Sequence, residues 1–142
     1  SRSLYSTMSR QAWHDGELRT MASFVYEFVN GRFDSELKGV NAAEREMVKK
    51  QPCGNKIWEY LESLQQSTNW DLGFVNHSAS SCQTKWSRYL QTRLHTIENL
   101  PSFKVLFLYF SLGIKLSKEA IKTVTSQYLA YDLKWTNGIL KH

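Results

Sequence analysis

Apolar residues recur with the period of an amphipathic helix in three segments of the chain, residues 15–30, 54–66 and 80–97. Such a period places the apolar side chains on one face of each helix, so the three faces are expected to pack together as a core. The predicted core faces are Leu18, Met21, Val25, Phe28 and Val29 in the first segment, Ile57, Trp58, Leu61 and Leu64 in the second, and Cys82, Trp86, Leu90, Leu94 and Ile97 in the third.

The segments between these helices predict an inserted helix and a loop. Residues 41–50 favour a short helix, for which the side chain of Asn41 is a suitable N-cap. Residues 67–77 lack a helical period and predict a loop that Trp70 and Phe74 anchor to the core. A serine in the run that follows this loop is expected to cap the third core helix.

The end of the chain, residues 99–142, predicts an extension with elements of its own. A helix over residues 103–112 is followed by a break at Gly113 and a second helix over residues 117–131. Asn137-Gly138 favours a two-residue hairpin turn, because both positions tolerate a positive φ. The flanking strands are expected near residues 131–135 and 139–141.

These elements predict a mainly all-α fold. Three core helices, the last preceded by a loop, match the plan of a helix-turn-helix bundle, here with insertions and a C-terminal helical extension that ends in a short β-hairpin. The expected division is an N-terminal arm over residues 1–12, a helical domain over residues 13–98 and the extension over residues 99–142, packed on that domain. With 142 residues, 42% apolar and 13% aromatic, the chain can build such a core.

Composition and motifs exclude several classes of function. The sequence has no phosphate-binding glycine loop, no HExxH motif and no nucleophile elbow, and its carboxylates are scattered. His77, His95 and Cys82 lack a zinc-binding spacing. No run of about 20 apolar residues could span a membrane. We therefore expect no catalytic residue, no cofactor, no metal, no small-molecule substrate and no membrane partner.

The charge distribution favours a polyanionic partner. The net charge is +5, and no acidic residue occurs between Asp71 and Glu98. Lys85, Arg88 and Arg93 all fall within that run. Since duplex DNA repels acids and attracts Lys and Arg, this pattern predicts that the polar face of the third core helix docks on DNA.

The same helix carries a family resemblance. The pattern S-x-x-x-C-Q-x-K-W-x-x-x-L at residues 78–90 resembles the third helix of Myb/SANT domains. GNKIWEYLE (54–62) and RYLQTRL (88–94) resemble the Myb-like domain of the repressor-activator telomere proteins. The acidic opening of the first helix after Trp13 is also similar, so that Trp13, Trp58 and Trp86 would be the three core tryptophans. Family members have shorter connections between their helices than this chain has, so the implied fold is Myb- or homeodomain-like with insertions.

The resemblance implies binding to double-stranded telomeric DNA, with a G-rich repeat, by a protein of the nucleus and chromosome. It also assigns roles to individual residues, and an Arg88–guanine contact is the simplest of them. The base-reading positions would be Ser80, Gln83, Thr84, Ser87 and Arg88. The backbone-contacting positions would be Lys56, Lys85, Gln91, Arg93 and, in the arm, Arg2 and Arg10.

An alternative function is a protein-interaction module of a chromatin or telomere-associated protein. SANT domains bind proteins. In the extension, PSFKVLFLYFSLGI (101–114) and YDLKWTNGILKH (131–142) resemble the end of a nematode-type SPK domain. Together with the Myb-like helices, this makes the chain similar to the double-strand telomere-binding proteins of nematodes. A continuous basic surface from the third helix to the arm and the tail lysines would favour DNA. Interruption of that surface by Glu59, Glu62 or Glu119 would favour a protein partner.

Overall fold

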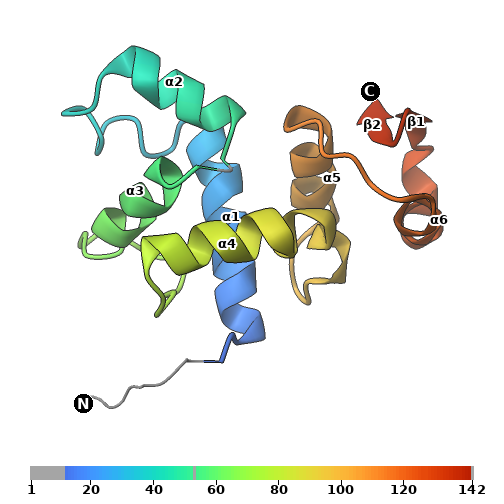
Figure 1. Cartoon of the computed structure of the whole chain (residues 1–142), viewed down its shortest axis with the longest axis horizontal. Coiled ribbons are helices and arrows are strands. Elements are labelled where there is room, and N and C mark those ends of the chain that lie inside the picture. Colours follow the sequence, from blue (N-terminus) through green and yellow to red (C-terminus); the bar gives the residue numbers. More distant parts are fainter. Residues whose placement is uncertain (1–11, 53, 142) are drawn as a thin grey trace.

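The computed structural model describes residues 12–52 and 54–141 and is mainly helical, with one C-terminal hairpin (Figure 1). This confirms the predicted fold class. Its α-helices and strands are α1 (Asp15–Val29), α2 (Ala42–Lys50), α3 (Lys56–Leu64), α4 (Ala79–Arg88), α5 (Ser102–Ser111), α6 (Lys118–Gln127), β1 (Lys134–Thr136) and β2 (Ile139–Lys141). Three short 3₁₀ turns are η1 (Leu90–Thr92), η2 (Leu94–Thr96) and η3 (Leu129–Tyr131).

The core forms around α1, which α4 crosses in Figure 1. Trp58 of α3 and Trp86 of α4 are both buried, and their ring centroids lie 5.7 Å apart. Trp13 lies at the edge of this core, half-buried and stacked on His77 with centroids 3.6 Å apart. The predicted core faces are buried, except that Leu18, Val29 and Ile97 are only partly covered.

The inserted helix α2 forms as its sequence predicts. The Asn41 side chain accepts hydrogen bonds from the N–H groups of Ala43 at 2.8 Å and Glu44 at 3.2 Å. None of the nine residues of α2, all of which the structure describes, is buried. It is attached to the core by the partly buried side chain of Val48 and by a polar contact, in which the Tyr60 hydroxyl of α3 donates to the Glu44 carboxylate at 2.7 Å.

The third core helix is shorter than predicted. The expected helix over residues 80–97 is α-helical only to Arg88 and continues as the turns η1 and η2. The reason is that its buried apolar residues are spaced four apart. An α-helix turns about 100° per residue, so each step of four drifts by about 40°, and three such steps separate Cys82 from Leu94. Leaving α-helical geometry at Tyr89, where φ is −136°, lets Leu90 and Leu94 both remain buried.

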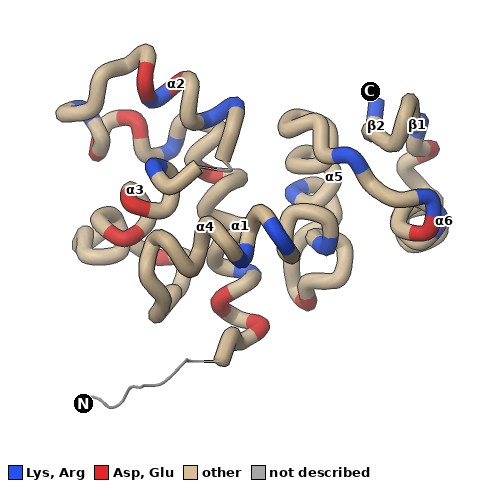
Figure 2. The backbone as a smooth tube through the Cα atoms, in the orientation of Figure 1, with Lys and Arg blue, Asp and Glu red and all other residues tan. Residues whose placement is uncertain are grey.

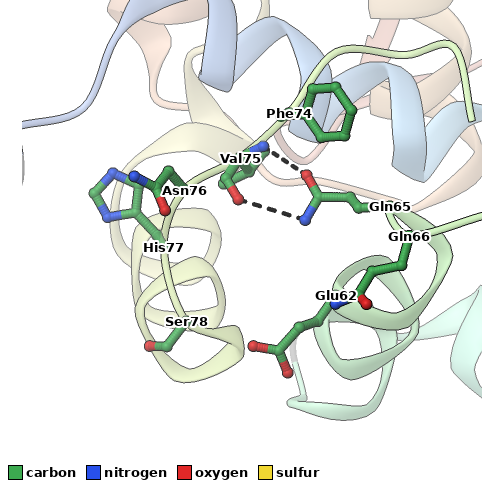
Figure 3. Close-up of a pocket in the computed structure, with 8 residues that line it drawn as sticks. All are labelled: Glu62, Gln65, Gln66, Phe74, Val75, Asn76, His77 and Ser78. Carbon is green, nitrogen blue, oxygen red and sulfur yellow. Dashed lines mark hydrogen bonds between the residues drawn. The ribbon is translucent and has the colours of Figure 1, made fainter.

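The loop before α4 is anchored differently from the prediction. Trp70 packs against the core as expected, but Phe74 is 68% exposed and the buried residue is its neighbour Val75. The Val75 N–H donates to the side-chain oxygen of Gln65 at 2.6 Å, which holds this extended segment against α3 (Figure 3). Because neighbouring side chains of an extended chain point to opposite sides, the burial of Val75 turns Phe74 outward.

The C-terminal extension packs on α1 through α5. The rings of Phe103 and Phe107 meet the Tyr26 ring edge-on, at centroid distances of 5.8 and 5.2 Å. A buried pair joins α5 to η2, since the Tyr109 hydroxyl lies 2.6 Å from Nδ1 of His95. The helix expected over residues 117–131 becomes α6 followed by η3.

The predicted hairpin forms at the end of the chain. Asn137 and Gly138 both have positive φ values, 52° and 83°, as a two-residue hairpin turn requires. The strands pair in the register Thr136 with Ile139 and Trp135 with Leu140. The β1 strand begins at Lys134, a little later than its expected position.

Candidate nucleic-acid interface

The candidate interface is built on α4, whose inner side is fixed by the core. The Ser78 side chain caps the helix by accepting from the Ser81 N–H at 3.1 Å. Cys82 and Trp86 are buried beneath it. Burial raises the pKa of the Cys82 thiol to about 12, with Glu17 and Glu62 contributing in the same direction. Cys82 is therefore a protonated core residue rather than a nucleophile.

A buried carboxylate fixes the segment that leads into α4. Glu17 of α1 accepts from the backbone N–H groups of His14 at 3.1 Å and Asn76 at 2.8 Å, and it lies 3.4 Å from Nε2 of His77. These contacts tie the start of α1 to the loop directly before Ser78. The sequence indicates only an acidic opening of this helix, because nothing in it brings residues 17 and 76 together.

The five predicted base-reading residues all lie on α4. Ser80, Thr84 and Arg88 are exposed, and Arg88 makes no hydrogen bond or ion pair within the described part of the chain. Gln83 and Ser87 are half-buried, and the Gln83 amide donates to the Ser87 hydroxyl at 3.2 Å. The side chains most open to a groove are thus those at residues 80, 84 and 88.

The predicted backbone-contacting residues are more dispersed. Lys85 lies on α4, but Gln91 and Arg93 follow its end, in and after η1. Lys56 is exposed at the first position of α3, and the Asn55 side chain before it makes no capping bond. Arg2 and Arg10 lie outside the described residues.

An aromatic residue that sequence analysis did not single out organises two of these cations. The Lys85 ammonium lies 4.1 Å from the Tyr89 ring centroid, and the Arg93 guanidinium lies 4.3 Å from it. Lys85 also lies 5.7 Å from the Trp13 ring centroid. Cation–π contacts of this kind favour a fixed position for a charged side chain that has no acid beside it. In the sequence, the four-residue spacing of Lys85, Tyr89 and Arg93 could have indicated this cluster.

Acidic residues border only part of this surface. Glu62 lines a hollow of about 450 Å³ at the N-terminal end of α4, across from Ser78 (Figure 3). Glu59 is exposed on α3, and Glu119 is exposed in the first turn of α6. The cationic part of the α4 surface therefore begins near Lys85 and runs toward the C-terminal end of the helix (Figure 2).

The remaining basic residues differ in whether they form ion pairs. Several cations of the N-terminal half are paired with acids, whereas many in the C-terminal half are exposed and form no ion pair with any described residue. The paired ones include Arg32, Arg45 and Lys49. The unpaired ones include Arg88, Lys115, Lys118, Lys122 and Lys141.

Comparison of the chain with protein-family models, with curated proteins and with solved structures gave no match. The resemblance to Myb/SANT domains therefore stays a prediction. Over residues 12–52 and 54–141, no group of three or more His, Cys, Asp or Glu side chains is placed to hold a metal ion. Among the helices that the structure describes, none has the length and apolar character needed to cross a membrane.

Proposed function

We propose that this protein binds double-stranded DNA in a sequence-specific manner by inserting α4 into the major groove. The observation that carries the proposal is the exposed row of Ser80, Thr84 and Arg88 on the side of α4 opposite its buried residues. No acid occurs from residue 72 to residue 97 to repel phosphate. The choice of G-rich telomeric repeats, and of a nuclear location, rests on the Myb-like sequence resemblance alone.

The residues divide into two roles. Arg88 presents a guanidinium that can pair with O6 and N7 of guanine, and Thr84 and Ser80 present hydroxyl groups that suit either type of base. Lys85 and Arg93 flank Tyr89 and bind phosphates, which sets the register of the helix without reading sequence. The hydrogen bond between Gln83 and Ser87 holds these two half-buried side chains together beside the exposed row.

A fluorescence anisotropy titration tests this proposal. The protein is titrated against a G-rich telomeric duplex, a scrambled duplex of the same composition and the separated single strands, at several salt concentrations. We expect the telomeric duplex to bind most tightly. For both duplexes, the logarithm of the binding constant should fall linearly with the logarithm of the salt concentration. A preference for single strands, or equal affinity for the two duplexes, would contradict major-groove reading.

A second candidate function, a protein-interaction module, is favoured by two features. Glu62 borders the N-terminal end of α4, where a phosphate would otherwise approach. An apolar hollow of about 520 Å³ lies between α5 and the hairpin, with Phe103 and Tyr131 about half exposed in its wall. Failure of the folded protein to bind any duplex in the titration would leave this function as the better one.

A further inference from the structure

The two flanks of α4 differ in what lies beside them. Since an α-helix turns about 100° per residue, the residues before and after the inward-pointing Trp86 lie on opposite flanks. Lys85 lies on one flank, with Tyr89 and Arg93. Ser87 lies on the other, where its backbone carbonyl accepts a hydrogen bond from the Gln91 amide at 3.0 Å.

The Ser87 flank opens into a hollow of about 350 Å³. Three segments that are far apart in the sequence form it: the C-terminal end of α2, the turn η1, and the link between α5 and α6. It lies beside Trp86, at the C-terminal end of α4. No acidic residue lines it, and its polar lining residues are Lys50, Gln51, Gln91, Thr92 and Lys115.

The two lysines of this hollow carry charges that the protein leaves unneutralised. Lys49, the neighbour of Lys50, pairs with both Asp34 and Glu46, but Lys50 forms no ion pair with a described residue. Lys115 likewise forms none among the residues that the structure describes. Two cations without a nearby acid repel each other, so an anion between them lowers the electrostatic energy.

The hairpin holds Lys115 in place. The backbone of Lys115 forms an antiparallel β-bridge with Ile139, and the N–H of the next residue, Leu116, donates to the Gly138 carbonyl at 2.8 Å. A Cβ atom added at Gly138 would lie 3.0 Å from Cγ of Lys115, so the lysine stem runs directly over the turn. The hairpin thus fixes one side of the hollow, and the inserted helix α2 supplies the other.

We propose that this hollow is a second phosphate-binding site, in which Lys50 and Lys115 bind the backbone of one strand of the DNA duplex. A helix in the major groove has a sugar–phosphate backbone on each side, because the groove is only about 12 Å wide. Lys85 and Arg93 face one backbone, and the hollow faces the other. This inference rests on the proposed function, and it assigns a role in DNA binding to the inserted helix and the C-terminal extension.

The test compares two double variants that remove the same charge. Lys50→Gln/Lys115→Gln removes the cations of the hollow, and Lys38→Gln/Lys134→Gln removes two other exposed lysines, of which Lys134 is already paired with Asp132. Binding of each to the telomeric and scrambled duplexes is measured across salt concentrations. We expect the first variant to lower the salt slope by about 0.9 for each lost phosphate contact, equally for both duplexes, and the second to change it little.

The outcomes separate this inference from the proposed function. If the unaltered protein binds duplex with sequence preference but the two double variants have the same salt slope, the hollow is not a phosphate site and the proposed function stands. If the unaltered protein binds no duplex, the proposed function fails and this inference fails with it. Circular dichroism melting checks that both variants fold.

Duplexes with neutral methylphosphonates on one strand at a time show which backbone the hollow contacts. Methylphosphonates on the strand that the hollow contacts should weaken DNA binding by the unaltered protein but have no further effect on binding by Lys50→Gln/Lys115→Gln, because that contact is already lost. For Lys85→Gln/Arg93→Gln, the strand whose methylphosphonates have no further effect should be the opposite one. Finding the same strand for both variants would overturn the two-flank arrangement.

Discussion

Two basic regions of this protein use their charges in opposite ways. In the inserted segment before Lys50, residues 31–49, Asp34 lies 3.1 Å from Lys49 and 3.5 Å from Arg45, so that one carboxylate neutralises two cations. In the strip from α4 to η2, residues 79–96, the chain has no acid at all, and Lys85 and Arg93 contact the Tyr89 ring instead. Ion pairing, rather than the number of lysines and arginines, therefore distinguishes a candidate DNA surface from an ordinary solvated one.

The α4 strip and the helix α2 of the inserted segment also differ in burial, and this difference leads to the largest expected effect. Trp86 is buried beneath the strip, whereas Met47 on α2 is 63% exposed. We expect Trp86→Ala to lower the free energy of unfolding by about 3–5 kcal/mol, because it removes a fully buried aromatic side chain. Met47→Ala is the control, expected to stay within about 0.5 kcal/mol. Urea denaturation measures both, and similar losses would show that α4 is not anchored as described.

The next effect concerns the availability of the cations to DNA. Arg88→Ala should cost about 1–3 kcal/mol of binding free energy on the telomeric duplex and relax the preference at one base pair. Arg45→Ala, which removes a cation already paired with Asp34, should leave the affinity unchanged. Anisotropy titrations with single-base variants of the duplex measure the difference. An equal loss for Arg88→Ala on telomeric and scrambled duplexes would refute its role as a base reader.

Removing the neutralising carboxylate should affect stability instead of recognition. Asp34→Asn leaves Arg45 without its ion-pair partner and Lys49 with Glu46 alone, although both side chains are largely covered, and should cost about 1–2 kcal/mol of unfolding free energy. Asp132→Asn, which removes an exposed partner of Lys134, should cost much less. Urea denaturation of the two variants decides the point. Equal stability of both would show that the inserted segment does not depend on its ion pairs.

The smallest effect is a pH dependence at the end of the strip. Burial lowers the pKa of His95 below its usual value of 6.5. The unfolded chain therefore takes up a proton at a higher pH than the folded one, and stability present above about pH 6.5 falls as the pH drops. His95→Gln should reduce this part of the pH dependence, as urea denaturation between pH 5 and 8 would show. An unchanged profile would mean that other groups cause the acid sensitivity.

Much of the fold could be predicted because its signals are local. The Asn41 cap, the Asn137-Gly138 turn and the core faces of α1 and α3 each depend on a few neighbouring residues, and the structure confirms them. The predicted length of the third core helix was wrong, because a spacing of four was read as one α-helical face. Phe74 was wrongly expected to anchor its loop for a related reason, since either of two adjacent apolar residues could fill the same core position.

The candidate site divides in the same way. The placing of Ser80, Thr84 and Arg88 on one exposed helix face followed from the sequence, because the buried positions of α4 define the opposite face. Three other features could not be predicted from the sequence: the Glu17 contacts, the cation–π contacts of Tyr89, and the convergence of Lys50 with Lys115. Their residues come together in space for reasons that the local pattern does not contain. Whether these groups meet depends on how the helices cross.

Local sequence is enough to predict which segments form helices, which sides of them are apolar, and where acidic residues are missing, because these properties depend on neighbours within a turn or two. Which cations are neutralised and which are exposed depends instead on the folded arrangement of the whole chain. An ion pair or a hollow needs groups from distant segments at distances of a few ångströms, and the packing of α1, α2, α4 and the hairpin sets those distances.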